Sequence, residues 1–207
     1  MGTSDAKLDQ SLQDILLLAG HEGKYEIKRT QIGNGEQDWL QSLHFQTSGK
    51  PKLLLMHGFG GSGALFFKLV AELLEWFDVT AVDWLGMGCS GRPDYSPQIY
   101  DTPEKAIDYF VESLNTWIEK TEFRSESDYV LAGHSMGGYL SVHFALKHPE
   151  KISKLILISP VGFPIMPEGF KEKKLGMQTG FKKFKETAKA SLWDKHWSPI
   201  TVFRITG

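Results

Sequence analysis

Residues 129–138 read Tyr-Val-Leu-Ala-Gly-His-Ser-Met-Gly-Gly and decide the fold that we expect for this chain. The apolar residues at the start of this stretch predict a short strand that is buried on both faces. A helix is predicted over residues 138–147. Gly133, Ser135 and Gly137 therefore occupy the turn between a strand and a helix, in the pattern Gly-x-Ser-x-Gly.

This turn is typical of a serine nucleophile. The serine is expected to have a strained backbone that holds its hydroxyl out over the C-terminal edge of a parallel sheet. The N-terminus of the following helix favours negative charge that develops there. We predict Ser135 as the nucleophile, and Gly133 and Gly137 as glycines that a tight turn requires. An ordinary glycine turn is the alternative, and the flanking strand and helix favour the nucleophile.

A second glycine-rich loop agrees with the first. His57-Gly58-Phe59-Gly60-Gly61 follows the apolar run at residues 53–56, which predicts another buried strand. A loop in this position can donate one backbone N–H to an oxyanion, and the residue after the nucleophile donates the other. We therefore predict an oxyanion hole formed by the N–H groups of Phe59 and Met136.

Strands alternate with helices along most of the chain. Residues 24–46 predict two strands joined at Asn34-Gly35 by a type I′ turn, and Thr102 with Pro103 predicts the start of a helix. Further strands are predicted at 79–82 and 155–158, and a further helix at 64–76. This alternation indicates an α/β fold with a mostly parallel sheet and flanking helices.

Composition narrows the class of protein. The chain has 207 residues, 41% of them hydrophobic, which suits one domain with a sizeable core. A net charge of −2 gives no overall basic field, so no nucleic-acid partner is expected. The single cysteine, Cys89, excludes a disulfide framework within the chain. We expect an intracellular, cytoplasmic protein, and no metal-ligand cluster points to a metal or organic cofactor.

Three segments are predicted. Residues 1–23 carry an amphipathic helix, which we expect to dock on the domain rather than to anchor in a membrane. Residues 24–165 form the core, and residues 166–207 begin a lid. Within the lid, residues 168–197 contain eight lysines, four acids and eight large apolar side chains. This pattern predicts peripheral contact with a membrane or lipid-droplet surface, and a solvated helix packed on the domain is the equal alternative.

Two sets of motifs resemble a known family. The loops at 57–61 and 83–93 resemble the α/β-hydrolase superfamily in general. Other motifs are similar to a subfamily of lysophospholipase/N-acylphosphatidylethanolamine lipases, a lipid-droplet lipase co-activator and fungal cardiolipin-specific deacylases. These motifs lie at residues 110–114 with Trp117, 133–138, 159–164 and 198–207.

The resemblance implies an α/β-hydrolase fold and a lipid substrate. The co-activator branch has asparagine at the elbow, whereas this chain has Ser135, so the resemblance favours a catalytic member. The substrate implied is a lipid ester or amide, such as a phospholipid or lysophospholipid, and the localisation implied extends to membranes, lipid droplets or mitochondria. Members have also been assigned acyltransferase activity through a His-x-x-x-x-Asp motif, and no histidine in these 207 residues is followed by aspartate at that spacing.

A catalytic acid and base are not evident in these 207 residues. In this fold they follow the serine in the order acid, then histidine, so His57 and His134 are expected to be structural. The only later aspartate is Asp194, and the later histidines are His143 and His148, expected at the surface, and His196, two residues beyond Asp194. Asp194 and His196 are too close to come from separate strand ends. We therefore expect a fold truncated before its last two strands, and an inactive 207-residue chain.

Three functions remain open from the sequence. The leading hypothesis is a serine hydrolase, or its N-terminal portion, that forms an acyl-enzyme on Ser135. The second is a non-catalytic lipid-binding or lipase co-activator protein. The third is a small-molecule esterase or epoxide hydrolase, although the latter normally has aspartate in place of Ser135.

Overall fold

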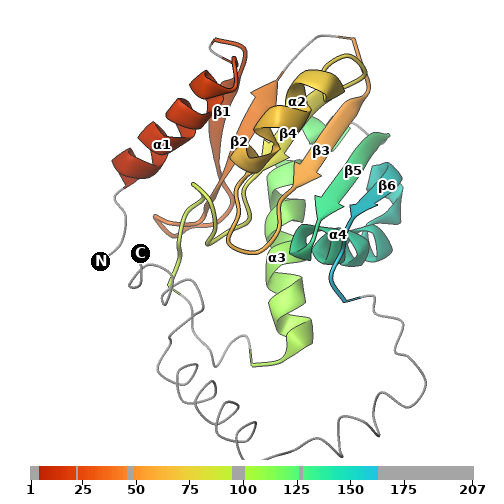
Figure 1. Cartoon of the computed structure of the whole chain (residues 1–207). Coiled ribbons are helices and arrows are strands. Elements are labelled where there is room, and N and C mark those ends of the chain that lie inside the picture. Colours follow the sequence, from red (N-terminus) through yellow and green to blue (C-terminus); the bar gives the residue numbers. More distant parts are fainter. Residues whose placement is uncertain (1–4, 22, 46–48, 95–100, 126–127, 163–207) are drawn as a thin grey trace, which may run out of the picture. The chain divides into compact units, whose positions relative to one another are not determined.

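A computed structural model describes residues 5–21, 23–45, 49–94, 101–125 and 128–162. These residues form a six-stranded sheet in the order β1-β2-β4-β3-β5-β6 (Figure 1). β1 and β2 are antiparallel to their neighbours, and β4, β3, β5 and β6 run parallel. The strands are β1 (Glu26–Gln31), β2 (Trp39–Phe45), β3 (Lys52–Met56), β4 (Asp78–Val82), β5 (Tyr129–His134) and β6 (Ile152–Ile158). The predicted mostly parallel α/β sheet is confirmed.

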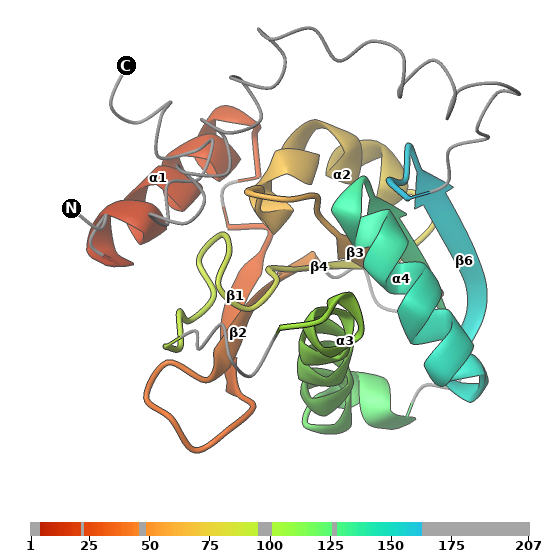
Figure 2. The ribbon, with the colours of Figure 1, turned by 90° about the horizontal axis from the view of Figure 1, so that it is seen from below.

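Helices cover both faces of the sheet (Figure 2), and the buried apolar side chains form two layers, one on each face. Alternate residues of β3 enter different layers, because successive strand side chains point to opposite faces. Leu54 packs in the layer that includes residues of α3 (Pro103–Glu119) and α4 (Met136–Lys147). Leu55 packs in the layer that includes residues of α1 (Asp5–Leu18) and α2 (Phe67–Leu73). Short 3₁₀ helices complete the connections at η1 (Gly63–Phe66), η2 (Glu122–Ser125) and η3 (Pro149–Lys151).

The N-terminal helix docks on the domain, as expected. Leu12 and Leu16 of α1 are buried, and both belong to the apolar layer on the α2 side. Arg29 of β1 donates to Asp9 of α1 at 2.6 Å and ties the exposed side of the helix to the sheet. None of the described helices is long and apolar enough to span a bilayer.

The connection between β1 and β2 differs from the predicted turn. Gln31 pairs with Trp39, so the loop spans residues 32–38 instead of two residues. Neither Asn34 nor Gly35 has the positive φ that a type I′ turn needs. The loop is instead closed by Asp38, whose carboxylate accepts from the Gly35 N–H at 2.8 Å and whose backbone N–H donates to the Gly35 carbonyl.

Other element boundaries shift by a few residues. Thr102 caps α3 as predicted, because its side chain accepts from the Lys105 N–H. α4 begins at Met136, two residues before the prediction, and β6 begins at Ile152, three residues before it. The predicted lid at 166–207, with Asp194 and His196, lies outside the described residues.

Candidate active site

Ser135 occupies the junction between β5 and α4. Its backbone has φ 54° and ψ −118°, a positive φ that a residue with a side chain rarely adopts. The Ser135 N–H donates to the carbonyl of Ile158 at 3.0 Å, and its carbonyl accepts from Val161 at 3.2 Å. The end of β6 therefore holds the expected strained conformation in place.

The two predicted turn glycines are required by close backbone contacts. A methyl group at Gly133 would lie 2.5 Å from the Gly137 carbonyl oxygen. A methyl group at Gly137 would meet the carbonyl oxygens of Met56 and His57. These contacts join the turn after β5 to the end of β3, so the glycines allow the two loops to approach each other.

The loop at residues 57–61 lies directly beside Ser135. A methyl group at Gly58 would lie 3.0 Å from Cβ of Ser135 and 3.3 Å from Nδ1 of His134. β3 and β5 are neighbouring parallel strands, so the loops after their carboxyl ends meet at the same edge of the sheet. The structure thus brings together the loop of Phe59 and the turn of Ser135, which lie far apart in the sequence.

The two predicted oxyanion donors lie in the two loops at this edge of the sheet, Phe59 in the turn after β3 and Met136 at the start of α4. Met136 is the first residue of α4, a position whose N–H has no acceptor within its own helix. The N–H of Phe59 has no hydrogen-bond partner among the described residues, and its side chain is 60% exposed. Neither N–H group donates a hydrogen bond to another described residue.

His57 is a structural residue, as the sequence predicted. Its ring is buried, with Nδ1 2.7 Å from the Gly58 carbonyl and Nε2 3.0 Å from the Trp84 N–H, which donates to it. Nε2 therefore carries no proton and Nδ1 donates. Burial lowers the pKa of His57, against the opposing effects of Asp83 and of the Gly58 carbonyl. The ring is neutral and fixes the backbone that leads to Phe59.

Asp83 supports the same loop from the end of β4. Its buried carboxylate accepts from the Gly63 N–H at 2.5 Å and from the Cys89 N–H at 2.7 Å. Burial raises the pKa of Asp83, and His57, the two N–H groups and Arg92 oppose that rise. Asp83 thereby joins the segment after the loop at residues 57–61, which we call the oxyanion loop after its predicted role, to the turn at residues 83–91.

Trp84 completes this support. Its indole N–H donates to the His57 carbonyl at 2.9 Å. No role for Asp83 or Trp84 was predicted from the sequence. The sequence did contain a signal for Asp83, because this polar residue directly follows the buried strand predicted at 79–82. The carboxyl ends of parallel strands form the edge of the sheet where site residues gather.

His134, His143 and His148 differ in their surroundings. His134 is exposed beside Ser135. His143 and His148 lie at the surface as expected, although both are half-buried. The His143 ring packs edge-on against Tyr139 at 4.6 Å, and the His148 ring packs on Phe144 at 5.0 Å.

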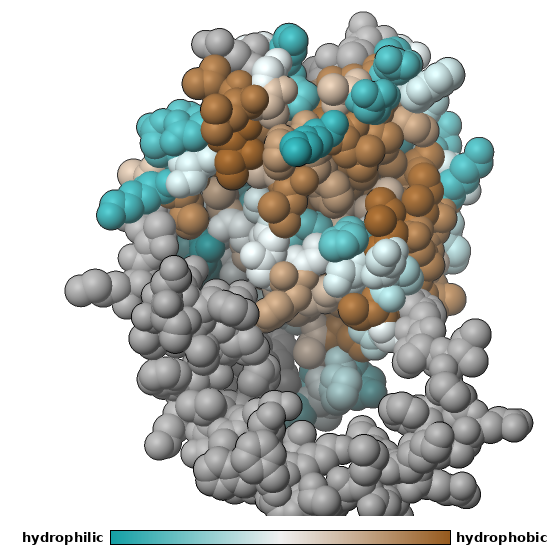
Figure 3. Space-filling view, viewed as in Figure 1, coloured by the Kyte–Doolittle hydropathy of each residue, from teal (hydrophilic) through white to brown (hydrophobic). Residues whose placement is uncertain are grey.

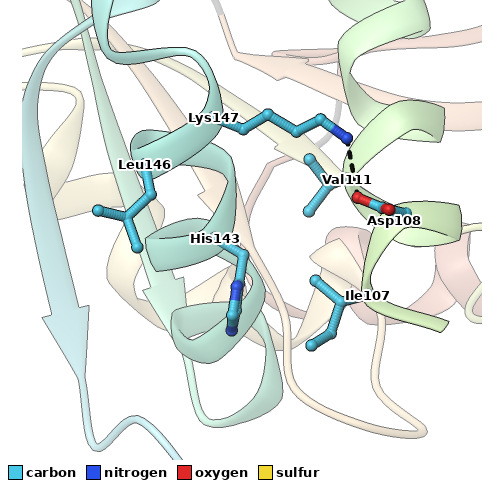
Figure 4. Close-up of a pocket in the computed structure, with 6 residues that line it drawn as sticks. All are labelled: Ile107, Asp108, Val111, His143, Leu146 and Lys147. Atoms are coloured by element: carbon cyan, nitrogen blue, oxygen red, sulfur yellow. Dashed lines mark hydrogen bonds and ion pairs between the residues drawn. The ribbon is translucent and has the colours of Figure 1, made fainter. Parts of the chain in front are cut away.

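In the described residues a groove lies between α3 and α4 (Figure 4). It measures about 280 Å³, and the Lys147 ammonium spans it to reach Asp108 at 2.8 Å. Lys147 also pairs with Glu112 at 2.8 Å, so its ammonium is held by two carboxylates. No residue of the oxyanion loop or of the turn at Ser135 lines the groove, and we therefore place the candidate site at Ser135.

Known proteins with similar sequences act on lipids. A 1-acylglycerol-3-phosphate O-acyltransferase of Arabidopsis thaliana is 31% identical over 187 residues, which cover 88% of this chain and 42% of that protein. A human (lyso)-N-acylphosphatidylethanolamine lipase is 32% identical over 146 residues, which cover 70% of this chain and 41% of that protein. The chain thus spans about two fifths of the length of these relatives.

Fold comparison and a family model agree with the architecture. The crystal structure of carboxylesterase CesB from Bacillus subtilis superposes with a TM-score of 0.60 at 22% identity, covering 75% of this chain and 50% of that one. The family model described as the alpha/beta hydrolase fold matches residues 51–202, which include the oxyanion loop and the turn at Ser135. The chain belongs to the α/β-hydrolase family.

Proposed function

We propose that this chain supplies the nucleophile and the oxyanion hole of a serine hydrolase that cleaves a lipid ester or amide. Ser135 attacks the carbonyl carbon and forms an acyl-enzyme, which water then hydrolyses. Among the described residues, none is assigned here as the general base or as the acid that orients it. The observation that carries the proposal is the position of the Gly58 backbone, in contact range of Cβ of Ser135.

The oxyanion hole follows from that contact. A carbonyl attacked by Ser135 develops negative charge on its oxygen, beside the N–H groups of Met136 and Phe59. The N-terminus of the 12-residue helix α4 adds a favourable field. Fixed donors of this kind lower the barrier without reorganising during the reaction, and the loss of one typically costs about 10²–10³ in kcat.

The lipid class rests on the relatives. The Arabidopsis acyltransferase and the human lipase both have names that specify glycerophospholipids or their lyso forms. A phospholipid, a lysophospholipid or an N-acylated phospholipid is therefore the substrate class that we propose. Phe59 follows Gly58 in the loop next to Ser135, and its exposed side chain suits an apolar acyl chain better than a small polar ester.

The proposal is tested with the variant Ser135→Ala, made in the full-length protein that the gene encodes. The variant should lose several orders of magnitude in kcat on lysophospholipid and N-acylated phospholipid substrates, with an unchanged unfolding midpoint. Ser11→Ala, at an exposed serine of α1, is the matched control and should keep full activity. Wild-type turnover by Ser135→Ala would refute the proposal. A wild type without turnover that still binds these lipids would favour the non-catalytic, co-activator function instead.

Acyl transfer is a second candidate, favoured by the name of the Arabidopsis relative. The same acyl-enzyme would pass its acyl group to the free hydroxyl of 1-acylglycerol-3-phosphate instead of to water. Adding 1-acylglycerol-3-phosphate to the lipase assay separates the two. Hydrolysis is supported if the released acyl group appears only as free fatty acid, beside the deacylated lipid. Transfer is supported by a diacyl product that requires Ser135.

A further inference from the structure

A group of large apolar side chains is exposed on the face that carries α1 and α2 (Figure 3). Ile15 and Leu18 belong to α1, Leu65 to η1 and Leu69 to α2. Leu18 is 88% exposed and Leu65 is 62% exposed. We call Ile15, Leu18, Leu65 and Leu69 the apolar patch.

The patch is a continuous surface rather than four scattered residues. Ile15, Leu18 and Leu65 line one hollow of about 180 Å³ between the end of α1 and η1, and Ala64 and Phe67 form the rest of its wall. Leu69 follows Leu65 by four residues along the helical segment, a spacing that places side chains side by side. All the side chains that line the hollow are apolar, so it offers no side-chain hydrogen bond to a polar ligand.

The patch also continues to the candidate active site. A methyl group at Gly61 would lie 2.9 Å from Cδ1 of Leu65, so Leu65 packs on the last residue of the oxyanion loop. Phe59, in the same loop, is 60% exposed. An apolar surface therefore runs from α1 to the loop that we assign to the oxyanion.

The charged residues near the patch show no positive excess. Within four positions of a patch residue, α1, η1 and α2 carry two acids, Asp14 and Glu72, and one lysine, Lys68. Recognition of anionic headgroups would require an excess of positive charge. The composition therefore favours a partner that is apolar and carries no negative charge where it meets the protein.

We propose that the apolar patch is the surface on which this protein rests on a lipid layer, through the acyl region and not through anionic headgroups. α1 carries apolar side chains on two sides, since Leu12 and Leu16 are buried against the domain while Ile15 and Leu18 remain outside. The inference deepens the proposed function, because it places the oxyanion loop beside the layer that contains the substrate.

The test is flotation of the protein with phosphatidylcholine vesicles, which carry no net charge. Wild type should bind, and neither 0.5 M salt, roughly enough to screen exposed charges, nor added anionic lipid should change binding more than about twofold. The double variant Leu18→Gln/Leu65→Gln should bind at least about tenfold more weakly. Circular dichroism and the unfolding midpoint confirm that the variants are folded.

A matched control is available on another face. Leu146 of α4 is 76% exposed and lies outside the patch, so Leu146→Gln should bind vesicles as wild type does, while Leu18→Gln alone should bind less.

Equal losses in the two single variants, or no binding of wild type to phosphatidylcholine, would overturn the inference. So would a wild-type dimer that the double variant converts to monomer without a change in vesicle binding. Binding that appears only with anionic lipid would assign the contact to the lysine-rich residues 168–197 instead. Ser135→Ala should bind normally, so a failure of the proposed chemistry is distinguishable.

Discussion

The Gly58 backbone lies so close to the Ser135 side chain that a methyl group added at Gly58 would lie 3.0 Å from Cβ of Ser135. The two residues follow the carboxyl ends of the neighbouring parallel strands β3 and β5. The sheet register therefore aligns a loop rich in backbone N–H groups with a strained serine. This alignment is the basis of the proposed chemistry.

Gly58→Ala should reduce activity more than stability. The new methyl group has to displace either the oxyanion loop or the Ser135 side chain by a few tenths of an ångström, and misplaced catalytic groups lose rate steeply. We expect a loss of about 10²-fold in kcat with a small change in KM. Steady-state kinetics and urea unfolding of the same preparation measure both effects. A variant with full kcat would mean that the loop is not positioned for the reaction.

Gly137→Ala should destabilise the fold itself. Its methyl group would meet the main-chain carbonyl oxygens of Met56 and His57, which cannot rotate away as a side chain does. We expect a loss of about 3 kcal/mol or more in the free energy of unfolding. Gly20→Ala is the comparison, because its φ of 76° is strained but a methyl group there meets open space. It should cost only about 1 kcal/mol, and equal urea midpoints for the two variants would contradict this account.

Local patterns predicted much of the fold. The apolar run at residues 53–56 and the helix cap at Thr102 depend only on residues close in the sequence, and the strand and the cap both lie where they were predicted. The β1–β2 turn was predicted wrongly, because the Asp38 side chain outweighs the turn preference of Asn34-Gly35. The His57–Asp83–Trp84 support was missed, since it depends on contacts between residues 27 positions apart.

His57 should remain neutral as the pH falls through about 6.5, the ordinary value for histidine. Burial lowers the pKa of His57, and its Nε2 accepts from Trp84. The unfolded chain then binds a proton that the folded chain does not, so this residue lowers stability as the pH falls below that value. Nitrogen-15 shifts of the ring should show the Nδ1–H neutral form from pH 7 to pH 5.5. A doubly protonated ring at pH 6, or the Nε2–H form, would be inconsistent with the structure.

Glu122 should contribute stability that is lost in acid. His44 lies buried between the Ser42 and Thr80 hydroxyls, and its Nδ1 is 3.2 Å from the Glu122 carboxylate. This hydrogen bond, followed by smaller contributions that include Lys28, lowers the pKa of Glu122 from 4.5 to about 2. Because the folded value is the lower one, the stabilisation is complete above pH 4.5 and disappears as the pH falls toward 2.

Glu122→Gln should remove that dependence. Urea unfolding at pH 6 should show a less stable variant, and the difference from wild type should shrink as the pH is lowered from 4.5 toward 2. Glu36→Gln, at an exposed residue of the β1–β2 loop, should follow wild type throughout. A difference between Glu122→Gln and wild type that stays constant with pH would mean that the carboxylate charge is not what matters.

Covalent labelling of the complete protein tests the central claim most directly. A fluorophosphonate reacts with a serine only when that serine is activated, so it reports the nucleophile without a known substrate. Peptide mass spectrometry should find one adduct, on Ser135, and Ser135→Ala should abolish it while Ser11→Ala leaves it unchanged. An adduct on another residue, or lipid hydrolysis that persists in Ser135→Ala, would contradict the assignment of Ser135 as the nucleophile.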